Sequence, residues 1–178
     1  MNTAIIMDDP SIRQRPTFKG YTKDVAKRAD VSEDVAKLFV DLFNNLYRQS
    51  LLANCSIRFP GIGTLHQLPE SVDGVCLALV PGVTSPAAGR RISQEELLRM
   101  AATEINYQMP DETFKDLPSF VKRMWSAHIK TAHHYYRNKG GVSLGKVGVI
   151  ARVKDNPTWL IDSELHLSVL SRRPHHTN

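Results

Sequence analysis

Seven histidines and two cysteines are the residues of this chain whose types most readily suggest chemistry. His133 and His134 are adjacent and would leave a helix in different directions, while His128 and His66 lie at no standard ligand spacing from cysteine or acidic residues. We therefore expect surface or half-buried histidines and no metal site. No set of Ser, His and acidic residues follows a recognisable nucleophilic motif. The sequence predicts a protein that is not an enzyme and that needs no cofactor.

The two cysteines and the amino-terminal residues bear on cellular location. Cys55 and Cys76 fall on strands expected to be neighbours, and small buried thiols are favoured over a disulfide because nothing else indicates an oxidising compartment. No apolar run reaches the roughly 18 residues that a membrane span needs. Asp8 and Asp9 stand where a signal peptide would carry a basic start. We expect a cytoplasmic protein without membrane contact.

Positive charge gives the clearest candidate site. The formal net charge is +5, and most of the excess lies after residue 100, along a predicted helix and the strands that follow it. These residues form either a solvated helix face or a site for a polyanion, and a positive face suits nucleic acid and acidic protein polymers alike. The candidate polyanion-binding residues are Lys122, Arg123, Lys130, Arg137, Lys139, Lys146, Arg152 and Lys154.

The elements that must position these residues occur twice. Residues 32–67 and 111–154 each read as a long amphipathic helix, a short strand, a glycine-bracketed turn and a second strand. A unit that cannot bury its apolar face alone can bury it against a second copy, so we expect the two long helices to pack together. The expected inter-repeat core consists of Phe39, Phe43, Leu46, Met124, Trp125 and Ile129.

Local signals set the expected ends of the elements. Thr22 and Ser32 are predicted helix N-caps, and Ser93 with Glu96 three residues later forms a capping box. The second long helix should stop at Gly140 in a left-handed conformation. Further strands are expected at 75–80, 142–144, 147–154 and 159–169.

These boundaries divide the chain into five parts. We expect an extended arm at 1–20, a first unit at 21–80, a linker at 81–91, a second unit at 92–170 and an unsupported tail at 171–178. The arm combines prolines with scattered apolar residues, which suits docking on a partner better than joining a core. Its expected docking residues are Ile5, Ile6, Ile12 and Phe18.

Residues 21–68 resemble the opening of the bacterial HU and integration-host-factor family of DNA-bending proteins. The resemblance rests on a short helix, a capped long helix, a strand and the turn Gly61-Ile62-Gly63-Thr64, in which Ile62 stands where an aromatic residue is common. The second copy matches only in pattern, through Gly145, Val147 and Gly148. Members of that family dimerise through these helices. The resemblance therefore implies an α+β fold in which two HU-like helix-helix-three-strand units form an intramolecular pseudo-dimer.

The chain departs from that family where its members bend DNA. The family's second and third strands extend into a long basic arm that enters the minor groove and inserts a proline wedge. Here residues 66–74 are short and carry two acids and no Lys or Arg, and the second copy offers only residues 154–158. Pro69 and Pro157 are better interpreted as turn prolines. Tight bending of a duplex is not expected.

Two armless units in tandem also resemble the paired HU-like domains of a eukaryotic coiled-coil-domain family associated with centrosomes and cilia. That resemblance implies a structural adaptor with protein partners in a larger assembly, among them tubulin or other axonemal proteins of the doublet microtubule. The alternative is an architectural DNA-binding protein in a nucleoid or nucleus. Both hypotheses use the same basic residues.

Overall fold

The computed structural model describes residues 4–7, 19–81, 89–111 and 114–173, which form an α+β fold of helices and two sheets. We call residues 21–80 the first half and residues 92–170 the second half. The elements of the first half are α1 (Tyr21–Ala29), α2 (Glu33–Leu52), β2 (Cys55–Phe59), β3 (Gly63–Val72) and β4 (Val75–Val80). Those of the second half are α3 (Gln94–Gln108), α4 (Leu117–Asn138), β6 (Gly141–Ser143), the short 3-10 helix η1 (Gly145–Val147), β7 (Gly148–Val153), β8 (Asn156–Ile161) and α5 (Ser163–Ser171).

The helix ends follow mostly from the local sequence. The Ser32 side chain accepts a hydrogen bond from the Val35 N–H at 3.3 Å, and Ser93 accepts one from the Glu96 N–H at 3.1 Å. Gly140, which follows α4, has a φ of +85° that a side chain would disfavour. The expected cap at Thr22 is wrong, because α1 already begins at Tyr21.

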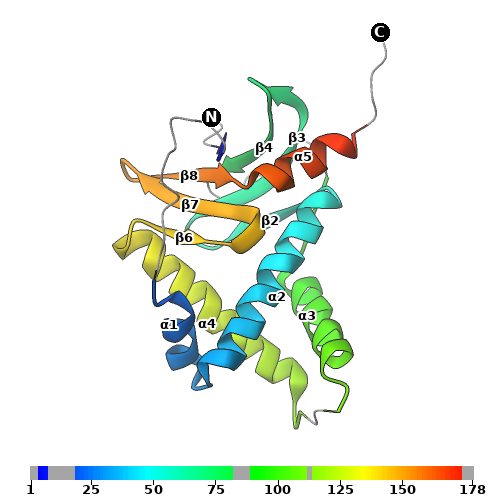
Figure 1. Ribbon diagram of the computed structural model, residues 1–178, viewed down its shortest axis with the longest axis vertical. Helices are drawn as coiled ribbons and strands as arrows, with labels where there is room; N and C mark the ends of the chain where they lie inside the picture. The colour runs from blue at the N-terminus through cyan, green and yellow to red at the C-terminus, as the bar shows by residue number, and fades with distance from the viewer. Residues whose placement is uncertain (1–3, 8–18, 82–88, 112–113, 174–178) are drawn as a thin grey trace.

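Two short strands, β1 (Ala4–Ile6) and β5 (Arg90–Arg91), complete the sheets. The four-stranded sheets have the orders β1-β8-β7-β6 and β4-β3-β2-β5, and they lie above the crossed helices α1 to α4 (Figure 1). Strand β1 (Ala4–Ile6) pairs in parallel with β8, with Ile5 opposite Leu160. The expectation that residues 1–20 form an extended arm outside the packed elements is therefore wrong for residues 4–6, including Ile5 and Ile6, because they pair with the edge of β8. Ile12 and Phe18 lie outside the described residues.

The strand expected at 159–169 is wrong after Ile161. The Asp162 side chain accepts hydrogen bonds from the N–H groups of Glu164 and Leu165 at 3.0 and 3.3 Å, which starts α5. Leu165 and Val169, one helical turn apart, are both buried. The expected tail also begins too early, because Ser171 ends α5 and Arg173 donates hydrogen bonds to the carbonyl oxygens of Leu68 and, at 3.2 Å, Cys76.

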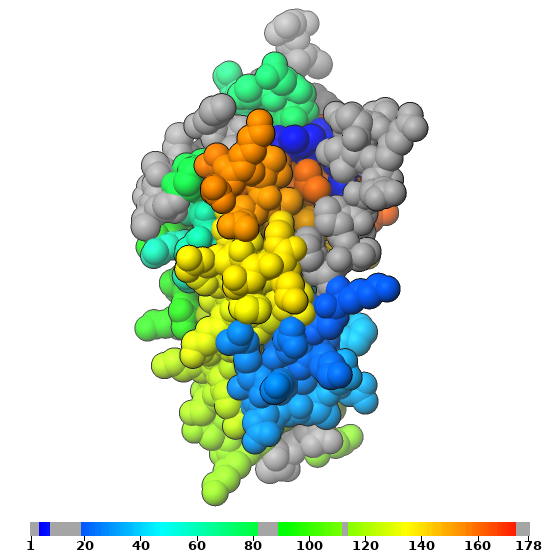
Figure 2. All heavy atoms as spheres, turned by 90° about the vertical axis from the view of Figure 1, so that its left-hand side faces the viewer, coloured from blue at the N-terminus to red at the C-terminus, as the bar shows by residue number. Residues whose placement is uncertain are grey.

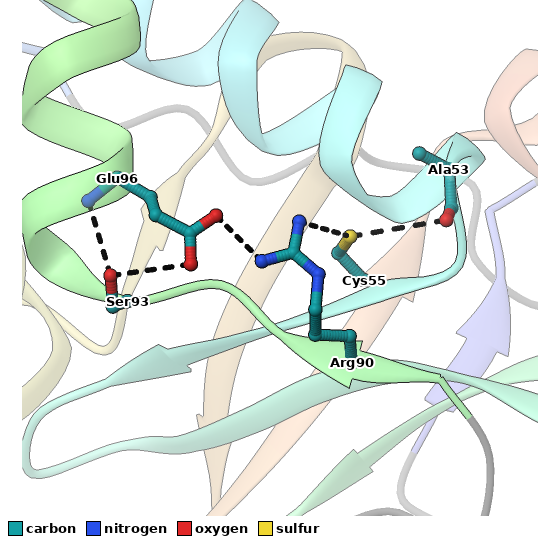
Figure 3. Close-up of polar contacts among 5 residues, drawn as sticks. All are labelled: Ala53, Cys55, Arg90, Ser93 and Glu96. Carbon is teal, nitrogen blue, oxygen red and sulfur yellow. Dashed lines mark hydrogen bonds and ion pairs between the residues drawn. The ribbon is translucent and has the colours of Figure 1, made fainter.

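The last two residues of the expected linker form a strand. Strand β5 (Arg90–Arg91) pairs in parallel with β2. The Arg90 guanidinium forms an ion pair with Glu96 at 2.6 Å and lies 4.0 Å from the Cys55 sulfur, so it joins β2 to the start of α3 (Figure 3). Residues 82–88 of the linker lie outside the described part of the chain.

One hydrophobic cluster contains residues of both halves. Phe43 is fully buried on α2, and its ring centroid lies 5.2 Å from that of Trp125 and 5.6 Å from that of His128, both on α4. Phe39 contacts Phe120 edge-on at 5.4 Å. Of the six expected core residues, Phe39, Phe43, Leu46, Met124 and Trp125 are buried and Ile129 is half-buried. The halves thus share their apolar surface, while the pseudo-dimer interpretation stays a prediction.

Each glycine turn rests on the long helix of the other half. A Cβ on Gly61 would lie 2.6 Å from the His133 ring of α4, and a Cβ on Gly145 would lie 3.4 Å from the Asn44 side chain of α2. The family turn continues with Gly63 and Thr64 at the start of β3, where Gly63 packs against the carbonyl oxygen of Val80. These contacts fix the turns against the helices.

Candidate polyanion-binding face

Helix α4 carries the largest group of predicted basic residues. Arg123, Lys130 and Arg137 are spaced by seven residues, which is nearly two full turns, so they lie on one side of the helix about 10.5 Å apart along its axis. The helix begins where the Asp116 side chain accepts a hydrogen bond from the Ser119 N–H at 3.3 Å. All three side chains are exposed.

Two adjoining grooves run along this side of α4. We call the first the upper groove; it has a volume of about 950 Å³ and lies between α1, the β2–β3 turn, α4 and β7. The cationic and imidazole side chains that line it are Arg28, Lys130, His133, His134, Arg137 and Arg152. The lower groove, of about 500 Å³, is lined by the cationic residues Arg28, Lys122, Arg123 and Lys130.

The face that holds these grooves is exposed over a large part of one side of the molecule. Figure 2 shows α1 in blue beside α4 in yellow, below the orange β7–β8 hairpin. Arg28 and Lys130 line both grooves, so the grooves are continuous at these two side chains. We call the two grooves together the basic face.

The basic face is strongly positive. Within the described part of the chain, no Asp or Glu side chain lines either groove. Arg152 forms an ion pair with Asp155 at 3.4 Å, but the Asp155 side chain is 92% exposed and neutralises little of the charge. Arg123 packs over the Phe120 ring at 5.0 Å, which limits where its guanidinium lies.

Five of the eight predicted polyanion-binding residues line these grooves: Lys122, Arg123, Lys130, Arg137 and Arg152. Lys139, Lys146 and Lys154 are exposed but line neither groove. Arg28 was not predicted, because it belongs to the short helix of the first half. Only the packing of α1 on α4 brings it beside Lys130. The pattern of basic residues along α4 alone gives no signal for it.

The expectation of surface or half-buried histidines is wrong for His66, His128 and His166, which are all buried, and His128 has no exposed surface. The Tyr21 hydroxyl donates to the His128 carbonyl oxygen at 3.0 Å and lies 2.7 Å from His128 Nδ1. The ring lies nearly parallel to those of Phe43 and Tyr47, at centroid distances of 5.6 and 6.0 Å. Burial lowers the pKa of His128 to about 3, so the imidazole is neutral at physiological pH.

The other residues considered for chemistry do not come together into a metal site or a disulfide in the described part of the chain. No group of three or more His, Cys, Asp or Glu side chains is placed to hold a metal ion there. Cys55 and Cys76 are buried and unbridged, and the expectation that they lie on neighbouring strands is wrong because β3 runs between β2 and β4. None of the helices in that part of the chain has the length and apolar character of a membrane span.

Comparison with known proteins adds no identification. No model of a protein family matches the sequence, and no curated protein matches it.

Proposed function

We propose that this protein is a non-enzymatic structural adaptor that docks through its basic face on an acidic cytoskeletal polymer, such as the doublet microtubule of a ciliary axoneme. The observation that carries this proposal is the pair of continuous grooves lined by six Lys and Arg side chains and by no described carboxylate. The polymer itself is suggested by the resemblance to paired HU-like domains in the sequence.

The geometry favours docking over catalysis. Both grooves are open and rich in hydrogen-bond donors, and neither holds a nucleophile beside a base that a third group orients. The shared core makes α1 and α4 one packed block, so the backbone positions that carry the cations of these two helices are fixed relative to one another. A charged face on such a block can bind without rearranging.

Replacing Arg123, Lys130 and Arg137 together by Gln should weaken docking. Exposed ion pairs contribute about 0.2–1 kcal/mol each, so loss of the three charges should weaken binding roughly 3- to 100-fold. Co-sedimentation of the full chain with microtubules measures this. The matched control replaces Lys139, Lys146 and Lys154 by Gln, which removes the same charge outside the grooves and should change binding much less. Equal losses in the two triple variants would argue against a defined docking face.

Duplex DNA is the second candidate, because its phosphates would meet the same cations. The hairpins, however, lack the basic arms that enter a groove: the β3–β4 hairpin carries Glu70 and Asp73 near its tip, and the β7–β8 hairpin carries only Lys154 beside Asp155 there.

We therefore expect weak, sequence-indifferent binding of DNA at low salt and no bending. Phosphate contacts lose affinity steeply as counterions compete, so binding should be nearly absent at about 150 mM salt. Energy transfer between dyes at the two ends of a short duplex measures both properties. Tight binding at that salt with a clear rise in energy transfer would replace the adaptor proposal by the DNA one.

A further inference from the structure

The upper groove differs from the lower one in how its charges are arranged. The cations of the lower groove lie mainly along α4, whereas those of the upper groove come from three elements: Arg28 from α1, Lys130 and Arg137 from α4, and Arg152 from β7. The β2–β3 turn at Pro60 and Gly61 adds a fourth side. Charges that surround a hollow suit a compact anion, while charges in a line suit a polymer.

The size and donors of the upper groove fit a small ligand rich in phosphate. Its volume of about 950 Å³ lies within the range of small-molecule sites, which is roughly 300–1,000 Å³. Three of its four permanent cations are arginines, whose planar guanidinium groups bind phosphate oxygens in pairs. Asn138 and the rings of His133 and His134 supply further hydrogen-bonding nitrogens.

One wall of the upper groove is held in place before any ligand arrives. Gly61 approaches the His133 ring so closely that a Cβ there would lie 2.6 Å from its atoms, and the Gly61 φ of +77° also disfavours a side chain. The Ile62 N–H donates to the Phe59 carbonyl oxygen at 3.0 Å and closes this turn. The turn and α4 are thus in direct contact beside the cations, which reduces the ordering that binding requires.

We propose that the upper groove is a binding site for a compact polyphosphate, either an inositol polyphosphate or a short polyphosphate chain, held by Arg28, Lys130, Arg137 and Arg152. Such an anion places several phosphates within reach of cations on three sides. The site does not depend on docking to a polymer, although a ligand there would compete with a polymer for all four of these side chains, because the upper groove is part of the basic face.

Calorimetric titration of the full chain with inositol hexakisphosphate, and separately with inorganic tripolyphosphate, tests this site at about 150 mM salt. We expect about one ligand per chain, with inorganic phosphate and citrate binding at least tenfold more weakly because they carry fewer charges. The two polyphosphates distinguish the ring-shaped source from the linear one.

Three double variants of equal charge locate the binding. Arg137→Gln with Arg152→Gln should weaken polyphosphate binding at least about tenfold, since it removes two of four permanent cations. Lys122→Gln with Arg123→Gln in the lower groove, and Lys139→Gln with Lys146→Gln outside both grooves, should each change it by less than about threefold. The lower-groove pair should still weaken co-sedimentation with microtubules, so failure of one proposal can be told from failure of the other.

Several outcomes would overturn the proposed site. Equal weakening in all three pairs would show that the ligand responds only to net charge. Binding of several ligands per chain would show the same, and absence of binding by the unmodified chain would rule the site out. Tight binding of a short DNA duplex that depends on both groove pairs, with no competition from inositol hexakisphosphate, would assign the upper groove to a polymer instead.

Discussion

Acidification should destabilise this protein steeply between pH 6.5 and about pH 3, chiefly through the fully buried side chain of His128. Burial also lowers the pKa of His166, which adds to the effect in the same direction. The unfolded chain binds a proton on this histidine below its ordinary pKa of 6.5, whereas burial lowers the pKa in the folded state to about 3. Between these values the unfolded state binds more protons than the folded state. The contribution of His128 to the free energy of unfolding is therefore fully present above pH 6.5 and is lost as the pH falls. The free energy of unfolding should fall by about 1.4 kcal/mol per pH unit, and by about 5 kcal/mol over the whole range.

The structural cause is that the surroundings of the His128 ring in the folded protein do not stabilise a positive charge. The ring is enclosed by Phe43, Tyr47 and Trp125, and Nε2 has no hydrogen-bond partner among the described residues. On the other side the Tyr21 hydroxyl already donates to the His128 carbonyl oxygen. Protonation would therefore leave a buried cation without a carboxylate beside it, and the chain would unfold to reach water.

Urea unfolding at a series of pH values measures this effect. His128→Phe keeps an aromatic ring in the core and removes the titrating group, so its stability should vary with pH less steeply than that of the unmodified chain, by about 1.4 kcal/mol per unit between pH 6 and pH 4. His134→Gln, at an exposed position, is the matched control and should retain the steep dependence. Equal slopes for His128→Phe and the unmodified chain would assign the acid sensitivity to other groups.

Phe43→Ala should cost about 3–5 kcal/mol of the free energy of unfolding, because the fully buried ring leaves a cavity between the two long helices. The position of the tryptophans makes this a test of the shared core. Both, Trp125 and Trp159, belong to the second half, while Phe43 belongs to the first. If the halves unfold together, the substitution must shift the transition seen by tryptophan fluorescence.

Trp159 gives the cleaner probe, because Trp125 touches Phe43 directly. We therefore expect the shift to persist in a Trp125→Phe background, where only the fully buried Trp159 of β8 reports. Leu167→Ala, at a position that is 64% exposed on α5, is the control and should change stability by less than about 0.5 kcal/mol. An unchanged Trp159 transition beside a separate, shifted transition in circular dichroism would show that the halves unfold independently.

The sequence by itself determined the elements whose signals are local. Ser32 and Ser93 cap their helices because their hydroxyls reach N–H groups only three residues away, and Gly140 ends α4 because it accepts a left-handed backbone. The apolar stripes of α2 and α4 likewise follow from spacings of three and four residues. For the same reason the line of cations at Arg123, Lys130 and Arg137 was visible in the sequence.

Tertiary structure alone decided the features that depend on residues far apart in the chain. Residues 4–6 have too little periodicity to predict a strand, and they become one because β8 exposes a free edge to pair with. His128 looks polar in sequence, yet it stacks on Phe43, 85 positions away. Arg28 joins the cations of α4 only because α1 packs there. Local spacing fixes which side of a helix a residue occupies, but burial and the grouping of charge arise from which elements the shared core brings together.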